Sequence, residues 1–140
     1  MAVASASAHL SSILKVTMYD HDPDGTSATD VSWQDMRDHS HIMILAMAST
    51  LTGAGANAFT ILSNPQSDGS GTDVEVKSHA VGSAPNAVGD YLMLEAEERE
   101  FTNRYVSASL TMANSADENV VVYIRKAKRA FSGNTADVVA

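Results

Sequence analysis

Apolar and polar residues alternate along much of this chain with the two-residue period of a β-strand. The clearest example lies within Tyr105–Ala113, where Val106, Ala108, Leu110 and Met112 alternate with Ser107, Ser109 and Thr111. Further short strands are predicted at Ala58–Ser63, Asp73–His79, Tyr91–Ala96 and Val120–Arg129. Most of the chain is therefore expected to form short strands that bury one face.

Two apolar segments fit a strand or a helix. In Ser11–Tyr19, the residues Leu14, Val16 and Met18 alternate with polar or aromatic neighbours, which favours a strand. His39–Leu51 is the most apolar segment of the chain. We interpret it as a central strand buried on both faces, with a helix as the competing interpretation. Glu97–Thr102 is acidic and could form a single helical turn.

Turn signals recur about every 8–12 residues, a spacing typical of β-sandwiches and barrels. Proline and glycine mark loops at Asp20–Thr29, Asn64–Thr72 and Val81–Gly89. The predicted fold is all-β: a single-domain β-sandwich or jelly-roll-like barrel over residues 13–130. Residues 1–12 and 131–140 are expected to be extended terminal arms.

The composition of the chain excludes several classes of function. A chain of 140 residues suits one domain, and the absence of cysteine excludes disulfides, thiolate zinc sites and a cysteine nucleophile. The net charge of −8 argues against a nucleic-acid partner. The N-terminus lacks the features of a signal peptide, and no apolar run is long enough for a membrane helix. We therefore expect a soluble protein, made in a cytoplasm, with no membrane partner.

No catalytic motif is evident, so a non-enzymatic protein without a cofactor is predicted. A G-x-S-x-G elbow is missing, and Gly69-Ser70-Gly71 lacks the lysine and helix of a phosphate loop. The acidic cluster Glu95, Glu97, Glu98 and Glu100 could supply paired carboxylates for glycoside chemistry. A solvated rim or short helix explains the same cluster without chemistry.

Two patterns could bind a metal ion. Asp20, Asp22 and Asp24, followed by Gly25, match the first half of a calcium loop, although Val31 stands where an EF-hand needs glutamate. An acidic surface turn is the alternative. His39-x-His41 would place two imidazoles on one face of a strand, but no third ligand can be identified. Ordinary strand-end histidines are the alternative there.

Charge is distributed unevenly. Residues 1–124 carry 16 acidic and 5 basic side chains, whereas Arg125, Lys126, Lys128 and Arg129 form a basic stretch near the end. Such asymmetry is typical of a docking surface, so these four residues are predicted to contact the acidic face of an identical neighbour or of another protein. An edge strand that resists aggregation is the alternative. Trp33, the single tryptophan, is predicted to be a core or interface anchor.

Several segments together resemble small virion structural proteins of tailed bacteriophages, above all capsid decoration (cement) proteins. They are the small-residue N-terminal arm and the segments Gly82–Glu95, Tyr105–Leu110 and Val120–Arg125. The likeness extends from about Tyr19 to Phe131. It implies a homo-oligomer, dimer or trimer, that binds the outside of a lattice of major capsid protein. The protein would then be made in the host cytoplasm and reside on the virion surface.

Two other functions stay open. Tail-tube and head–tail connector proteins of phages share much of this style of sequence. A calcium-dependent surface- or carbohydrate-binding β-sandwich, acting through Asp20–Asp24, belongs to a different class.

Overall fold

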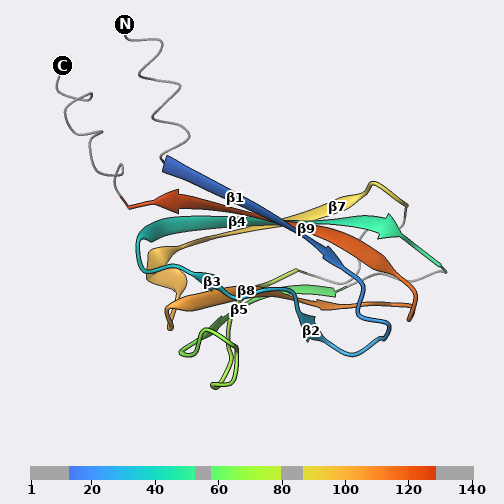
Figure 1. Cartoon of the computed structure of the whole chain (residues 1–140), viewed down its shortest axis with the longest axis horizontal. Helices are drawn as coiled ribbons and strands as arrows, with labels where there is room; N and C mark the ends of the chain where they lie inside the picture. The colour runs from blue at the N-terminus through green and yellow to red at the C-terminus, as the bar shows by residue number, and fades with distance from the viewer. Residues whose placement is uncertain (1–12, 53–57, 80–86, 129–140) are drawn as a thin grey trace, which may run out of the picture.

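The computed structural model describes residues 13–52, 58–79 and 87–128. These residues form β-strands and one short 3₁₀ helix, η2, in the order shown in Figure 1. The elements are β1 (Leu14–His21), β2 (Thr29–Asp30), β3 (Gln34–Asp35), β4 (His39–Thr50), β5 (Ala58–Asn64), β6 (Val74–Ser78), β7 (Tyr91–Glu97), η2 (Glu98–Glu100), β8 (Tyr105–Thr111) and β9 (Glu118–Ala127). Within the described ranges, no helix is long and apolar enough to cross a membrane.

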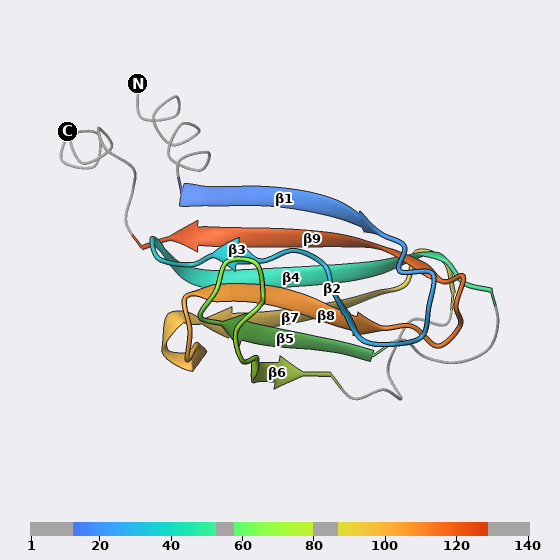
Figure 2. The same ribbon diagram turned by 60° about the horizontal axis from the view of Figure 1, so that its bottom comes forward.

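The strands form two antiparallel sheets that pack face to face, as Figures 1 and 2 show. One sheet has the order β1-β9-β4-β7, and the other has the order β2-β8-β5-β6 with β3 also paired to β8. Successive parts of the chain cross repeatedly from one sheet to the other. The architecture is the predicted single-domain β-sandwich.

The pairing of strands is nested along the sequence. β5 pairs with β6, β4 with β7, β2 and β3 with β8, and β1 with β9, all antiparallel. The chain therefore resembles one long hairpin, with its tip at β5-β6, wrapped so that alternate pairs fall in opposite sheets. This nesting is the jelly-roll arrangement.

The core lies between the two sheets and is formed by alternate residues of the strands. In β8, Val106, Ala108, Leu110 and the following Met112 are all buried, which confirms the predicted inward face of that segment. The remaining core side chains are Met36, Ile42, Ile44, Ala46, Phe59, Ile61, Leu92, Leu94, Ala96, Val121 and Tyr123. Tyr19 of β1 closes one side of the core by packing edge-to-face against Tyr123, with ring centroids 5.7 Å apart.

His39–Leu51 is indeed a central strand, because β4 lies between β9 and β7. The competing helix is wrong, and so is burial on both faces. Ile42, Ile44 and Ala46 are fully buried in the core, whereas Met43 and Leu45 on the opposite face are partly exposed. The second sheet covers β4 on one side, and among the described residues no element covers the other side (Figure 1).

Other sequence-based expectations have clear outcomes. Residues 14–21 form a strand, β1, and the helical turn expected within Glu97–Thr102 is η2. The interpretation of the basic stretch as part of an edge strand is wrong, because β9 lies between β1 and β4. The expected arms, residues 1–12 and 131–140, lie outside the described residues.

Candidate functional site

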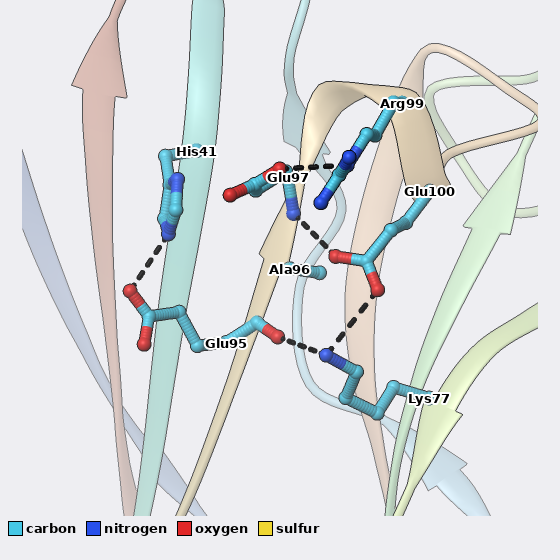
Figure 3. A pocket seen from close by; sticks show the side chains of 7 residues that line it. All are labelled: His41, Lys77, Glu95, Ala96, Glu97, Arg99 and Glu100. Carbon is cyan, nitrogen blue, oxygen red and sulfur yellow. Dashed lines mark hydrogen bonds and ion pairs between the residues drawn. The ribbon is translucent and has the colours of Figure 1, made fainter.

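A pocket of about 650 Å³ lies at one end of the sandwich. Figure 3 shows its walls, which come from β4, β6, β7 and η2. Its lining residues are His41, Lys77, Glu95, Ala96, Glu97, Arg99 and Glu100. Glu95, Glu97 and Glu100 of the acidic cluster thus line a pocket together with three basic side chains, whereas Glu98 lines a second pocket.

Ion pairs and hydrogen bonds join the pocket's charged groups to one another (Figure 3). His41 Nε2 lies 2.7 Å from Glu95 Oε1, and Arg99 Nε lies 2.8 Å from Glu97 Oε2. Lys77 Nζ lies 3.3 Å from Glu100 Oε1 and donates a hydrogen bond of 2.7 Å to the carbonyl oxygen of Glu95. Because Lys77 belongs to β6 and Glu95 to β7, this contact joins the two sheets at the end of the sandwich.

The electrostatics of the pocket suit a structural role. Glu100 accepts a 2.7 Å hydrogen bond from the backbone N–H of Glu97. This bond and the bond from Lys77 lower the pKa of Glu100. A glycosidase general acid needs the opposite shift, a pKa raised toward neutrality. The geometry therefore favours the predicted solvated rim, which the structure shows to be ion-paired, over paired catalytic carboxylates.

A second pocket of about 310 Å³ lies nearby, next to the loop before β8. Its rim carries a bidentate ion pair, in which Arg104 Nε and Nη2 donate to the two carboxylate oxygens of Asp35 over 2.8 and 2.5 Å. This hydrogen bonding lowers the pKa of Asp35. The pair joins β3 to the residue just before β8 and so fixes the short β3 strand.

The histidines of His39-x-His41 do not share a face, so that prediction is wrong. A register shift interrupts the pairing of β4 with β9: His39 lies opposite Ala127, while His41 lies opposite Lys126. Two steps along β4 therefore match one step along β9, as in a β-bulge, and the two rings point to opposite sides. His39 is buried and His41 is half-exposed in the pocket.

The predicted calcium loop is not assembled. Within residues 13–52, 58–79 and 87–128, no group of three or more histidine or carboxylate side chains is placed to hold a metal ion. Asp20 belongs to β1, whereas Asp24 adopts a positive φ of 51° in the turn that follows. The geometry thus gives no support to coordination by Asp20, Asp22 and Asp24.

The basic stretch is divided by the alternation of β9. Lys126 and the following Lys128 are exposed, but Arg125 is only 6% exposed and points into the sandwich. Its Nη1 donates a 2.9 Å hydrogen bond to the backbone carbonyl oxygen of Asp35. Arg125 is therefore not available as a surface contact, and Arg129 lies outside the described residues. The predicted partner contact can involve Lys126 and Lys128, the latter ion-paired with Glu98.

Trp33 is half-buried and lies outside the main core. Its indole lies directly over Gly69, since a Cβ atom built on that glycine would come within 2.2 Å of Trp33 Nε1. Gly69 belongs to the β5-β6 loop, which the buried Asn64 holds through hydrogen bonds to the carbonyl oxygens of Gly69 and Gly71. Trp33 therefore anchors this loop against the sandwich.

The sequence analysis missed one feature, the outer face of the β1-β9-β4-β7 sheet. We call this surface the apolar outer face. It is formed by Leu14, Val16, Met18, Met43, Leu45, Met47, Tyr91, Met93, Val120, Val122 and Ile124. The signal was present in β4, which is apolar at almost every position and therefore has two apolar faces.

No protein-family model matches the chain, and no curated protein matches its sequence. Among solved structures, it is similar to the Bacillus endospore appendage pilus, with a TM-score of 0.51, 15% identity, and coverage of 82% of this chain and 87% of that one. It is also similar to the VP2 subviral particle of infectious bursal disease virus, with a TM-score of 0.51, 10% identity, and coverage of 86% of this chain and 34% of that one. At such identities the likeness establishes the sandwich fold.

Proposed function

We propose that this protein is a non-enzymatic virion structural protein that binds the outer surface of an assembled capsid, as a decoration protein does. The partner would be the major capsid protein, and the protein would be made in the host cytoplasm. The sequence resemblance to phage decoration proteins and the jelly-roll arrangement support this proposal, since jelly rolls recur in viral capsid domains. Both structural neighbours come from assemblies, a subviral particle and a pilus.

The apolar outer face is the observation that carries the proposal. A sandwich needs one apolar face on each sheet, but here the β1-β9-β4-β7 sheet has two. A contiguous apolar patch of this kind usually marks a protein–protein contact. A protein that self-associates as it assembles has a use for such a surface, whereas the pocket in Figure 3 is lined by mutually paired charges.

The assembly cannot rest on disulfide links of the kind named for the endospore pilus, because the chain contains no cysteine. Lys126 is the proposed electrostatic contact with an acidic group of a neighbouring copy, and Lys128 is the proposed contact with an acidic capsid surface. Trp33 holds the β5-β6 loop in place. Several weak contacts made by one symmetric oligomer would together give firm attachment.

The proposal is tested by adding the purified protein to shells of the encoding virus that were assembled without it. We expect the protein to co-sediment with the shells, to saturate at a fixed ratio to the major capsid protein, and to raise the temperature at which the shells disrupt. A second acidic β-sandwich protein of similar size serves as the control. Protein that stays in the supernatant at saturating concentration would contradict the proposal, as would tubes or rings of this chain in electron micrographs, which would favour a tail-side role.

A further inference from the structure

The apolar outer face is laid out in regular cross-strand rows. The strand register gives three rows: Val16, Ile124, Met43 and Glu95; Met18, Val122, Leu45 and Met93; and Asp20, Val120, Met47 and Tyr91. Several members are strongly exposed, including Met18 at 68% and Val16 at 59%. Apart from Glu95 and the charged ends, the described part of the chain thus presents an apolar layer that nothing within it covers.

The opposite surface of the sandwich has a different character. The outer side of the β2-β8-β5-β6 sheet carries Ser109 and Thr111 of β8 next to Thr60 of β5, with half-buried Ala58 and Leu62 on either side of Thr60. Small hydroxyl side chains are readily solvated, so this surface can face water. The contrast identifies the β1-β9-β4-β7 sheet as the side that needs a protein cover.

The size of the face matches what a pair of identical chains requires. Strands lie about 4.8 Å apart and alternate residues about 6.7 Å apart, so the three rows together with the end row of Leu14, Lys126, His41 and Glu97 span about 500 Å² on each copy. Two copies stacked face to face would therefore bury about 1,000 Å², close to the lower bound for a specific interface. Stacked sheets are also the arrangement found inside the sandwich itself.

His41 and Glu95 form an ion pair on the β4-β7 side of the face, and two further charges of opposite sign lie at its two ends, where they make the face complementary to itself. Lys126 lies at one end of the rows, beside Leu14 and His41, and Asp20 lies at the other end, beside Val120. Both charged residues are exposed. Consider a two-fold axis that lies between the two stacked sheets and runs perpendicular to their strands. It places the first row of one copy over the last row of the other, and so brings Lys126 of each copy close to Asp20 of its partner.

We propose that the apolar outer face is the interface of a symmetric dimer, in which a second copy of this chain lies face to face on the first. The two β1-β9-β4-β7 sheets form the two central layers of the dimer, and the two β2-β8-β5-β6 sheets form the outer layers. Lys126 of each copy pairs with Asp20 of its partner and sets the two-fold register. The dimer supplies the self-association step of the proposed function and is tested without any shell.

Sedimentation equilibrium of the full chain between about 1 and 100 µM measures this association. We expect a species of twice the 14.8 kDa chain mass. Val16→Lys and Met93→Lys place a charge at positions 59% and 47% exposed, where the fold tolerates it, and should each weaken dimerisation at least tenfold. Val88→Lys makes the same change at a position 65% exposed in the turn before β7, outside the rows, and should leave the mass unchanged.

A charge exchange tests the register. Asp20→Lys and Lys126→Asp should each weaken the dimer by a few fold, and the double variant should restore most of the loss. A chain that stays monomeric at about 100 µM would overturn the proposal. So would a dimer or trimer whose mass the Val16 and Met93 variants leave unchanged. Because these outcomes do not involve shells, shell binding by a monomer would refute the dimer and leave the proposed function intact.

Discussion

Asp117 offers the sharpest test of the interactions that hold the sandwich together. Its side chain is fully buried at the turn between β8 and β9. One carboxylate oxygen accepts hydrogen bonds from the N–H and hydroxyl of Thr52 at 2.8 and 2.9 Å, and the other accepts from the N–H and amide of Asn114 at 3.2 and 3.3 Å. This single residue joins the end of β4 to the turn.

The substitution Asp117→Asn keeps the shape and loses part of this bonding. Whichever way the new amide turns, its NH₂ group faces two donors, so two hydrogen bonds to a charged acceptor are lost. With such bonds contributing about 1.5–3 kcal/mol each, and some recovery through water, we expect a loss of about 2–4 kcal/mol in the free energy of unfolding. Urea denaturation at about pH 7 should show this as a lower midpoint with an unchanged slope.

The pH dependence gives a second signature. Burial alone would raise the pKa of Asp117, but the hydrogen bonds from Thr52 and Asn114 outweigh it and lower the pKa below its usual value. A group with a depressed folded pKa stabilises the fold fully above its unfolded pKa and loses this effect as the pH falls through the folded value. The gap between wild type and variant should therefore narrow in acid. A gap under about 0.5 kcal/mol, or one that stays constant from about pH 7 to pH 2, would refute the reasoning.

Two further substitutions probe the loop anchor and the buried cation. Gly69 has a φ of +74° and lies under the Trp33 ring, so Gly69→Ala should lower stability by about 2 kcal/mol or more in urea denaturation. Gly25→Ala is the control, since its Cβ would meet an ordinary contact at 3.7 Å, and an equal loss there would contradict this account. Arg125 is buried: its Nη1 donates to the Asp35 carbonyl oxygen, whereas its Nε has no hydrogen-bond partner among the described residues. Burial lowers the pKa of Arg125. Arg125→Met should therefore leave the free energy of unfolding unchanged or raise it by about 1–2 kcal/mol, and a loss above about 2 kcal/mol would show that the guanidinium is needed.

Much of the fold could be predicted because alternation and turn chemistry are local properties of the sequence. Val106–Met112 shows this best, since its inward and outward residues follow directly from the two-residue period. The nested order of the strands could not be derived, because pairing depends on contacts between residues that are distant in sequence, such as Leu14 with Lys126.

The candidate site was harder to predict, for two physical reasons. A β-bulge between His39 and His41 changes which side each ring faces, and no turn residue signals it. The two-sided apolar character of β4 was recognised, but the sequence does not show whether one or two layers of this chain cover it. Arg125 was predicted to be a surface cation because its neighbours in the sequence are basic, but the alternation of β9 places its side chain inside the sandwich.

Methionine methyl groups test the central claim, that the apolar outer face is a protein–protein interface, most directly. The face carries Met18, Met43, Met47 and Met93, whereas Met36 and Met112 lie in the core as internal references. Carbon-13 methyl NMR with a soluble paramagnetic agent reports which of these groups water reaches. We predict that the four face methyls are protected like the core references at about 500 µM and become accessible on dilution or in Val16→Lys. Face methyls that are fully relaxed at every concentration, or protected equally in the monomeric variant, would contradict the account.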